Sequence, residues 1–177
     1  MARQYWVAPV PPFHTADGTA ATAAALAEIS PTPALVLPAN LLEAGGRLEF
    51  SAFGRMTTAA TPGAWTFGIY IGTAAIGAGQ AAIVSAAITA VASQTNKTWR
   101  LEGNASVRTV GASTAATILG CLEISNVSTN GTDLAPATAP TAFAFDSTVA
   151  NFVRLGATPS LATGSIQCHY FGMRLVN

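Results

Sequence analysis

Three glutamates are the first candidates for chemistry, because two carboxylates held at a fixed distance can hydrolyse a glycosidic bond. They are Glu49, Glu102 and Glu123. Such a pair needs one acid with a raised pKa and a second carboxylate opposite it. Glu49 and Glu102, however, each follow an arginine by two residues, Arg47 and Arg100, and residues two apart in a strand share a face. The spacing favours ion pairs on a sheet face, so we expect no enzyme.

Histidine and cysteine are scarce: the chain has only His14, His169, Cys121 and Cys168. Their spacing matches no metal-binding run, so we expect no metal site. In a reducing compartment the two cysteines are expected to be buried free thiols, with a disulfide as the alternative. His169 is expected to be a hydrogen-bonded structural residue of a strand.

Other functional signatures are missing from the sequence. The glycines at 72, 77 and 79 precede no Gly-Lys-Ser/Thr, and no nucleophile elbow occurs. The formal net charge is zero and no basic stripe is present, so nucleic acid is not an expected partner. No window of about 18 residues is apolar enough for a membrane span, and no secretory signal is recognisable. We therefore predict no cofactor, no nucleic acid, no membrane, and synthesis in the cytoplasm.

The composition indicates a protein that works by contact with other proteins. Half of the 177 residues are hydrophobic and 9% are charged, against about a quarter in ordinary soluble domains. A surface so poor in charge gives little protection against self-association. Lys97 is the only lysine, and arginine is enriched at protein interfaces where lysine is depleted.

Residues 1–34 differ from the rest of the chain. Prolines keep the stretch 8–12 (APVPP) extended, and the Thr/Ala-rich run over 19–27 has no amphipathic face. We predict an N-terminal arm over 1–34 that lies on another protein, with Tyr5, Trp6 and Phe13 as its contacts. A floppy terminus is the alternative. The body domain is predicted over 35–177.

The body reads as a series of strands. Alternating polar and apolar residues predict strands over 47–56, 65–71, 97–110, 116–127, 141–145, 151–155 and 165–176. Residues 81–92 fit either a helix or a strand with a break, and we favour the strand. Turns are predicted at Pro62-Gly63 and Asn130-Gly131. About eight strands without a convincing helix predict an all-β fold, a jelly-roll-like antiparallel β-sandwich with an extended N-terminal arm.

In the last predicted strand, 165–176, we expect side chains to alternate strictly between the two faces. Its first face carries Ile166, Cys168, Tyr170, Gly172 and Arg174, and its second carries Gln167, His169, Phe171, Met173 and Leu175.

Several stretches resemble small virion proteins of tailed bacteriophages. They are LPANLL at 37–42 followed by GRLEFSAFGR at 46–55, and TPG at 61–63 followed by FGIYIGT at 67–73. WRLEG at 99–103 resembles the strand with which such proteins begin the second half of a jelly roll. The resemblance covers residues 35–177 and rests on the texture of strands and turns.

The resemblance implies a head decoration protein or another head or tail component, commonly a trimer of jelly rolls whose arm contacts the particle. We therefore expect a structural virion protein, a capsid decoration or minor capsid protein, that forms homotrimers and binds the major capsid protein. The alternative is a tail fibre or baseplate module that binds a host surface glycan through the loops at 72–79 or 128–138. A glycan depolymerase that uses the three glutamates is the third and weakest hypothesis.

Overall fold

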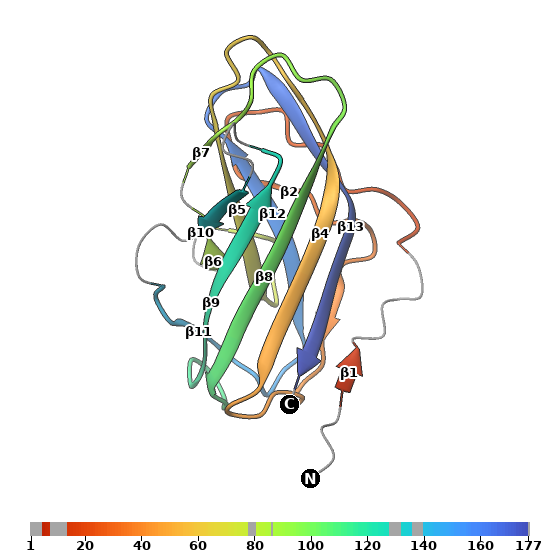
Figure 1. The fold of residues 1–177 in the computed structure, drawn as a ribbon. Coiled ribbons are helices and arrows are strands. Elements are labelled where there is room, and N and C mark those ends of the chain that lie inside the picture. The colour runs from red at the N-terminus through yellow and green to blue at the C-terminus, as the bar shows by residue number, and fades with distance from the viewer. Residues whose placement is uncertain are drawn as a thin grey trace.

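The chain folds into two antiparallel sheets packed face to face (Figure 1). The computed structural model describes residues 5–7, 14–77, 81–85, 87–127, 132–135 and 140–176. Every regular element in these ranges is a strand, which confirms the predicted all-β sandwich. No helix that is long and apolar enough to span a membrane occurs in them.

The larger sheet has seven strands. Its order is β1 (Tyr5–Val7), β13 (Gly164–Val176), β4 (Arg47–Thr58), β8 (Lys97–Thr109), β9 (Ala116–Ser125) and β10 (Thr132–Ala135), and β11 (Phe143–Phe145) also pairs with β9. In Figure 1 the long strands β13, β4, β8 and β9 form the front layer.

The smaller sheet lies behind this layer. Its order is β2 (Ala27–Glu28), β12 (Asn151–Pro159), β5 (Ala64–Gly72) and β6 (Ala81–Val84); β3 (Leu35–Leu37) pairs with β12 and β7 (Ile88–Thr89) pairs with β5. The strand with a break expected over 81–92 is thus confirmed as β6 and β7. The predicted turn at Asn130-Gly131 lies outside the described residues.

The core lies between the two sheets, and alternate residues of β4 and β8 point into it. Trp99 and Leu101 of β8 and Trp65 and Phe67 of β5 are fully buried, and the rings of Phe67 and Trp99 lie 5.6 Å apart. The alternation expected for residues 47–56 is observed, with Leu48, Phe50 and Ala52 buried. The inward residues of β4 and β8 are therefore used for packing, and their outward residues remain available for contacts with other molecules.

The strict alternation predicted for the last strand is wrong beyond residue 168. Cys168 pairs with Gly54 and Tyr170 pairs with Phe53, so His169 is an extra residue in a β-bulge. The bulge exchanges the two faces: Ile166 and Cys168 are buried before it, whereas Phe171, Met173 and Leu175 are buried after it. Tyr170 and Arg174 consequently point outward.

Residues 14–34, which the sequence assigned to the arm, pack on the body. The N–H groups of Gly18 and Ala21 donate to the carbonyls of Cys168 and Ile166, each at 2.9 Å, and so cover the edge of β13. Ile29 is fully buried, and its N–H donates to Leu155 O of β12 at 2.9 Å. Close approach depends on glycine at position 18, because a Cβ atom added there would lie 1.8 Å from Ile29 O.

Candidate functional site

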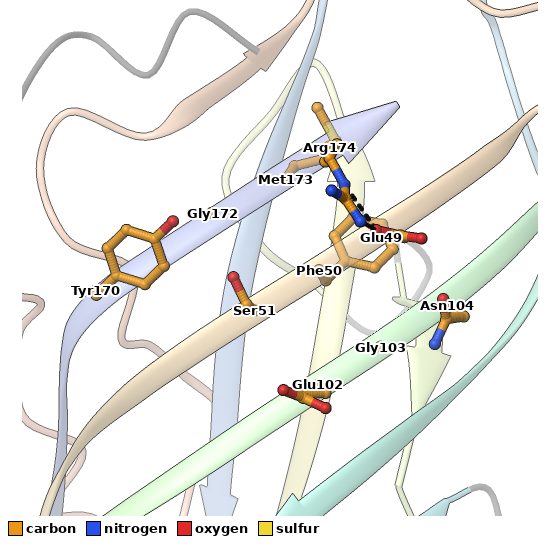
Figure 2. Close-up of a pocket in the computed structure, with 10 residues that line it drawn as sticks. All are labelled: Glu49, Phe50, Ser51, Glu102, Gly103, Asn104, Tyr170, Gly172, Met173 and Arg174. Carbon is orange, nitrogen blue, oxygen red and sulfur yellow. Dashed lines mark hydrogen bonds and ion pairs between the residues drawn. The ribbon is translucent and has the colours of Figure 1, made fainter. Parts of the chain in front are cut away.

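A hollow on the outer face of the larger sheet is the candidate site (Figure 2). It lies over β13, β4 and β8 and has a volume of about 470 Å³. The backbones of the three strands form its floor. The outward side chains around it come from Glu49, Ser51, Glu102, Asn104, Tyr170 and Arg174.

Strand register places these side chains in rows. Arg174 of β13 is opposite Glu49 of β4, which is opposite Asn104 of β8. In the next row Gly172 is opposite Ser51, and Ser51 is opposite Glu102. Figure 2 shows Tyr170 at one end of the hollow and the Arg174–Glu49 pair at the other, with Ser51 between them.

An aromatic pair, called the aromatic wall below, lies at one end of the hollow, with Tyr170 in its lining and Phe53 beyond it. The rings of Tyr170 and Phe53 stack with centroids 5.4 Å apart and planes 14° from parallel. His14 contacts Tyr170 edge-on at 5.9 Å, which holds the ring from another direction. Phe53 is 48% exposed, so much of its ring remains accessible to solvent beside Tyr170.

A glycine in β13 allows the tyrosine ring to lie down on the sheet. A Cβ atom added at Gly172 would lie 2.3 Å from the hydroxyl oxygen of Tyr170. Any larger residue at this position would force the ring away. Gly172 therefore fixes the shape of the aromatic wall by leaving room for it.

The charged groups of the hollow are paired with one another. Arg47 and Arg174 both bind Glu49, with Arg174 Nε 2.7 Å from Glu49 Oε2, and Arg100 binds Glu102. These contacts confirm the ion pairs expected for Glu49 and Glu102. The hydrogen bond from Arg174, helped by the charge of Arg47, lowers the pKa of Glu49 although burial acts in the opposite direction. A general acid needs a raised pKa, so Glu49 does not suit that role.

The third predicted glutamate lies on the same face. Glu123 of β9 is directly opposite Glu102 of β8. Like charges in this arrangement repel each other, and the ion pair that Arg100 forms with Glu102 offsets part of the repulsion. The structure thus brings the three glutamates onto one face, where two of them serve as ion-pair partners.

The histidines and cysteines have structural surroundings. His169 Nδ1 is 2.9 Å from Asp17 Oδ2, which ties the N-terminal segment to β13. Both cysteines are free thiols, as expected, although Cys121 is only half-buried. Burial raises the pKa of Cys168 to about 12, so this thiol is chemically quiet. Among the described residues no group of histidine, cysteine and carboxylate side chains has the arrangement of a metal site.

The predicted arm contacts lie elsewhere. Tyr5 and Trp6 belong to β1, which pairs with the end of β13 through Tyr5 opposite Val176 and Trp6 opposite Leu175. Phe13 lies outside the described residues. So do parts of both loops suggested for a glycan, residues 78–80, 128–131 and 136–138.

The sequence reasoning did not select the aromatic wall. Phe53 falls in step with Arg47, Glu49 and Ser51, so the parity of its strand already placed it on the polar face. The bulge changes the face on which Tyr170 lies, so strict alternation did not place it beside Phe53. One residue could have indicated the bulge. Strict alternation placed the charged Arg174 on the same face as the apolar Ile166.

Comparison of the chain with models of known protein families found no match, and comparison with curated proteins found none.

Proposed function

We propose that this chain is a structural virion protein, a capsid decoration or minor capsid protein that forms homotrimers. It stabilises a phage head by binding the major capsid protein. The observation that carries the proposal is the position of β1. The strand that contains two of the three expected contact residues, Tyr5 and Trp6, is the terminal strand of the larger sheet.

A terminal strand has one edge available for a partner. β1 pairs with β13 on one side, and on its other side it pairs with no strand in the described part of the chain. The free N–H and C=O groups of such an edge can pair with a strand of another protein, and side chains then add specificity. An edge strand with a tyrosine and a tryptophan combines both contributions, because these residue types are enriched at energetically dominant contacts.

The contacts of the N-terminal segment with the body support the same proposal. Gly18 and Ala21 bind the edge of β13, and His14 Nε2 lies 3.0 Å from Phe171 O. These contacts fix the segment to the body from His14 onward. The residues before His14 are therefore the ones that the proposal assigns to the partner.

The proposed mechanism is stapling. Trimers at the junctions between capsid subunits add buried area, and a specific interface of standard size buries roughly 1,600 Å². Each arm extends the contact onto a neighbouring subunit, so that several weak contacts act together. A surface with few charges suits this role because little charge has to be desolvated on binding.

The first test is the mass of the purified chain in solution, with and without empty heads of the phage that encodes it. We expect a trimer that co-sediments with the heads. A chain that lacks residues 1–13, or that carries Trp6→Ala, should stay folded and lose co-sedimentation. Phe53→Ala is the control and should bind heads normally. A trimer that ignores the heads would contradict decoration, and a monomer would contradict assembly.

A further inference from the structure

The outer face of the larger sheet has a second hollow next to the candidate site. It is lined by Phe53, Gly54, Arg55, Thr98 and His169 and has a volume of about 520 Å³. Phe53 borders this second hollow and Tyr170 borders the first, and the two rings stack on each other. The stacked pair therefore separates two hollows that lie on one face of the sheet.

We infer that this face binds a neutral oligosaccharide, with the Phe53–Tyr170 pair as the platform between two sugar-binding hollows. This function goes beyond virion assembly and uses a surface away from β1. It also places glycan recognition on the sheet face, whereas the sequence had suggested the loops at 72–79 and 128–138.

The mixture of side chains in the first hollow fits a sugar. A pyranose has an apolar C–H face, which packs on an aromatic ring, and a rim of hydroxyls, which need donors and acceptors. The ring of Tyr170 offers the aromatic surface, and Ser51 and Asn104 offer hydrogen-bond donors and acceptors. Ser51 and Asn104 make no side-chain hydrogen bond to any described residue, so their polar groups remain available to a ligand.

The charges of the hollow indicate a neutral ligand. Two carboxylates, Glu49 and Glu102, and one guanidinium, that of Arg174, border it, so its charges largely balance and a charged sugar gains little there. Both carboxylates are already bound by arginines of the same face, so the hollow has no strong demand for a cation. Carboxylates with spare lone pairs accept hydrogen bonds from hydroxyl groups, which neutral sugars supply in quantity.

The size of the site indicates a chain of sugars. Each hollow falls within the range of about 300–1,000 Å³ that is usual for small-molecule sites. Both are open to solvent along the sheet, and the aromatic pair between them is exposed, with Phe53 at 48%. A ligand that occupies both hollows has to cross the stacked rings, and an oligosaccharide can do so while keeping an apolar face on them.

The side chains of the platform contact one another without any ligand. Phe53, His14 and the space above Gly172 fix the Tyr170 ring, and two arginines fix Glu49. A site whose side chains are already ordered loses little entropy on binding. Weak contacts to a sugar can then give measurable affinity.

The test uses the full chain on an array of neutral oligosaccharides of glucose, mannose, galactose, xylose, rhamnose and N-acetylhexosamines, followed by calorimetry with the probes retained. At least one neutral oligosaccharide should bind, and acidic oligosaccharides such as oligogalacturonate should not. Phe53→Ala should weaken binding about ten-fold or more, because it removes half of the platform. Ser51→Leu, which fills the floor of the first hollow, should weaken it similarly.

Phe152→Ala is the matched control, because Phe152 is also an exposed phenylalanine, 37% exposed, but belongs to β12 of the other sheet. It should leave affinity unchanged. Binding of no neutral oligosaccharide would overturn the inference, and so would equal losses in Phe53→Ala and Phe152→Ala. Because the arm truncation tests head binding and Phe53→Ala tests sugar binding, either proposal can fail without the other.

Discussion

At the residue scale, the indole nitrogen of Trp99 donates a hydrogen bond beside the bulge that shapes the candidate site. Trp99 Nε1 donates to Gln167 O at 3.1 Å, and Gln167 lies two residues before the bulged residue His169. A bulge interrupts the ladder of backbone hydrogen bonds, so a carbonyl beside it needs another donor. The buried tryptophan supplies that donor from β8, which lies two strands away from β13 in the same sheet.

The chain offers a matched pair of tryptophans to measure this bond. Trp65 is also fully buried, but its Nε1 has no hydrogen-bond partner among the described residues. Trp99→Phe and Trp65→Phe both remove part of a buried ring, and only the first leaves a carbonyl without its donor. We expect Trp99→Phe to lower the free energy of unfolding by about 1–3 kcal/mol more than Trp65→Phe.

Urea denaturation followed by circular dichroism measures both variants. Equal losses would mean that water satisfies Gln167 O when the indole is absent, and would contradict a structural role for the bond.

Several single residues were predictable because they depend only on local spacing. The Arg47–Glu49 and Arg100–Glu102 pairs follow from the two-residue period of a strand. The partner of Glu49 on β13, Arg174, lies 125 residues away, and no local pattern indicates it. The aromatic pair has the same origin, since Phe53 and Tyr170 meet only through strand pairing.

At the element scale, the pairing of β13 with β4 decides which residues form the candidate site. The bulge at His169 turns Tyr170, Gly172 and Arg174 outward, and each then meets a residue of β4. Bulges are difficult to infer from sequence because one extra residue changes the parity of everything after it. The existence of both strands was therefore predictable, whereas the face on which Tyr170 lies was not.

The ion pairs of Glu49 make the joint between these two strands sensitive to acid. The folded-state pKa of Glu49 is lowered from its ordinary value of 4.5, chiefly by the hydrogen bond from Arg174. The carboxylate therefore stabilises the folded state above its ordinary pKa, and this contribution is lost as the pH falls through the lowered pKa. Glu49→Gln should lower the free energy of unfolding by ~0.5 kcal/mol at neutral pH, because the side chain remains partly solvated.

The measurement is urea denaturation of wild type and Glu49→Gln across the acid range. The difference between them should disappear once the pH lies below the lowered pKa. Glu102→Gln is the matched control, since it removes an exposed pair with a single arginine and should have a smaller effect at neutral pH. A difference that persists unchanged in acid would show that the ion pairs do not cause it.

At the scale of the whole molecule, the two-sheet sandwich was predictable and the path of the N-terminal segment was not. Alternation and turn residues identify strands one at a time, and their number without helices leads to a sandwich. Residues 14–34 contain few such signals. Ile29 is fully buried and Ala21 is 1% exposed, but the sequence around them gives no period from which to infer burial.

Two truncations separate the parts of this segment. Removal of residues 1–13 should leave the thermal stability of the body nearly unchanged. Removal of 1–34 should unfold or aggregate the body, because it uncovers the edge of β13 and takes Ile29 from the core. Calorimetry and light scattering on the two proteins measure these outcomes. Equal stability of the two truncated chains would contradict an integral role for residues 14–34.

The position of β13 has a consequence for the order of synthesis. Its backbone partners among the described residues, β1, the segment 14–21 and β4, all precede it along the chain. While the ribosome makes the intervening residues, one edge of β4 stays open and the N-terminal segment lacks its main partner. Such long-range pairings make folding slow and expose unpaired edges to aggregation. The nascent protein therefore depends on its last long strand to close the larger sheet, and chaperones would find it most accessible just before that strand emerges.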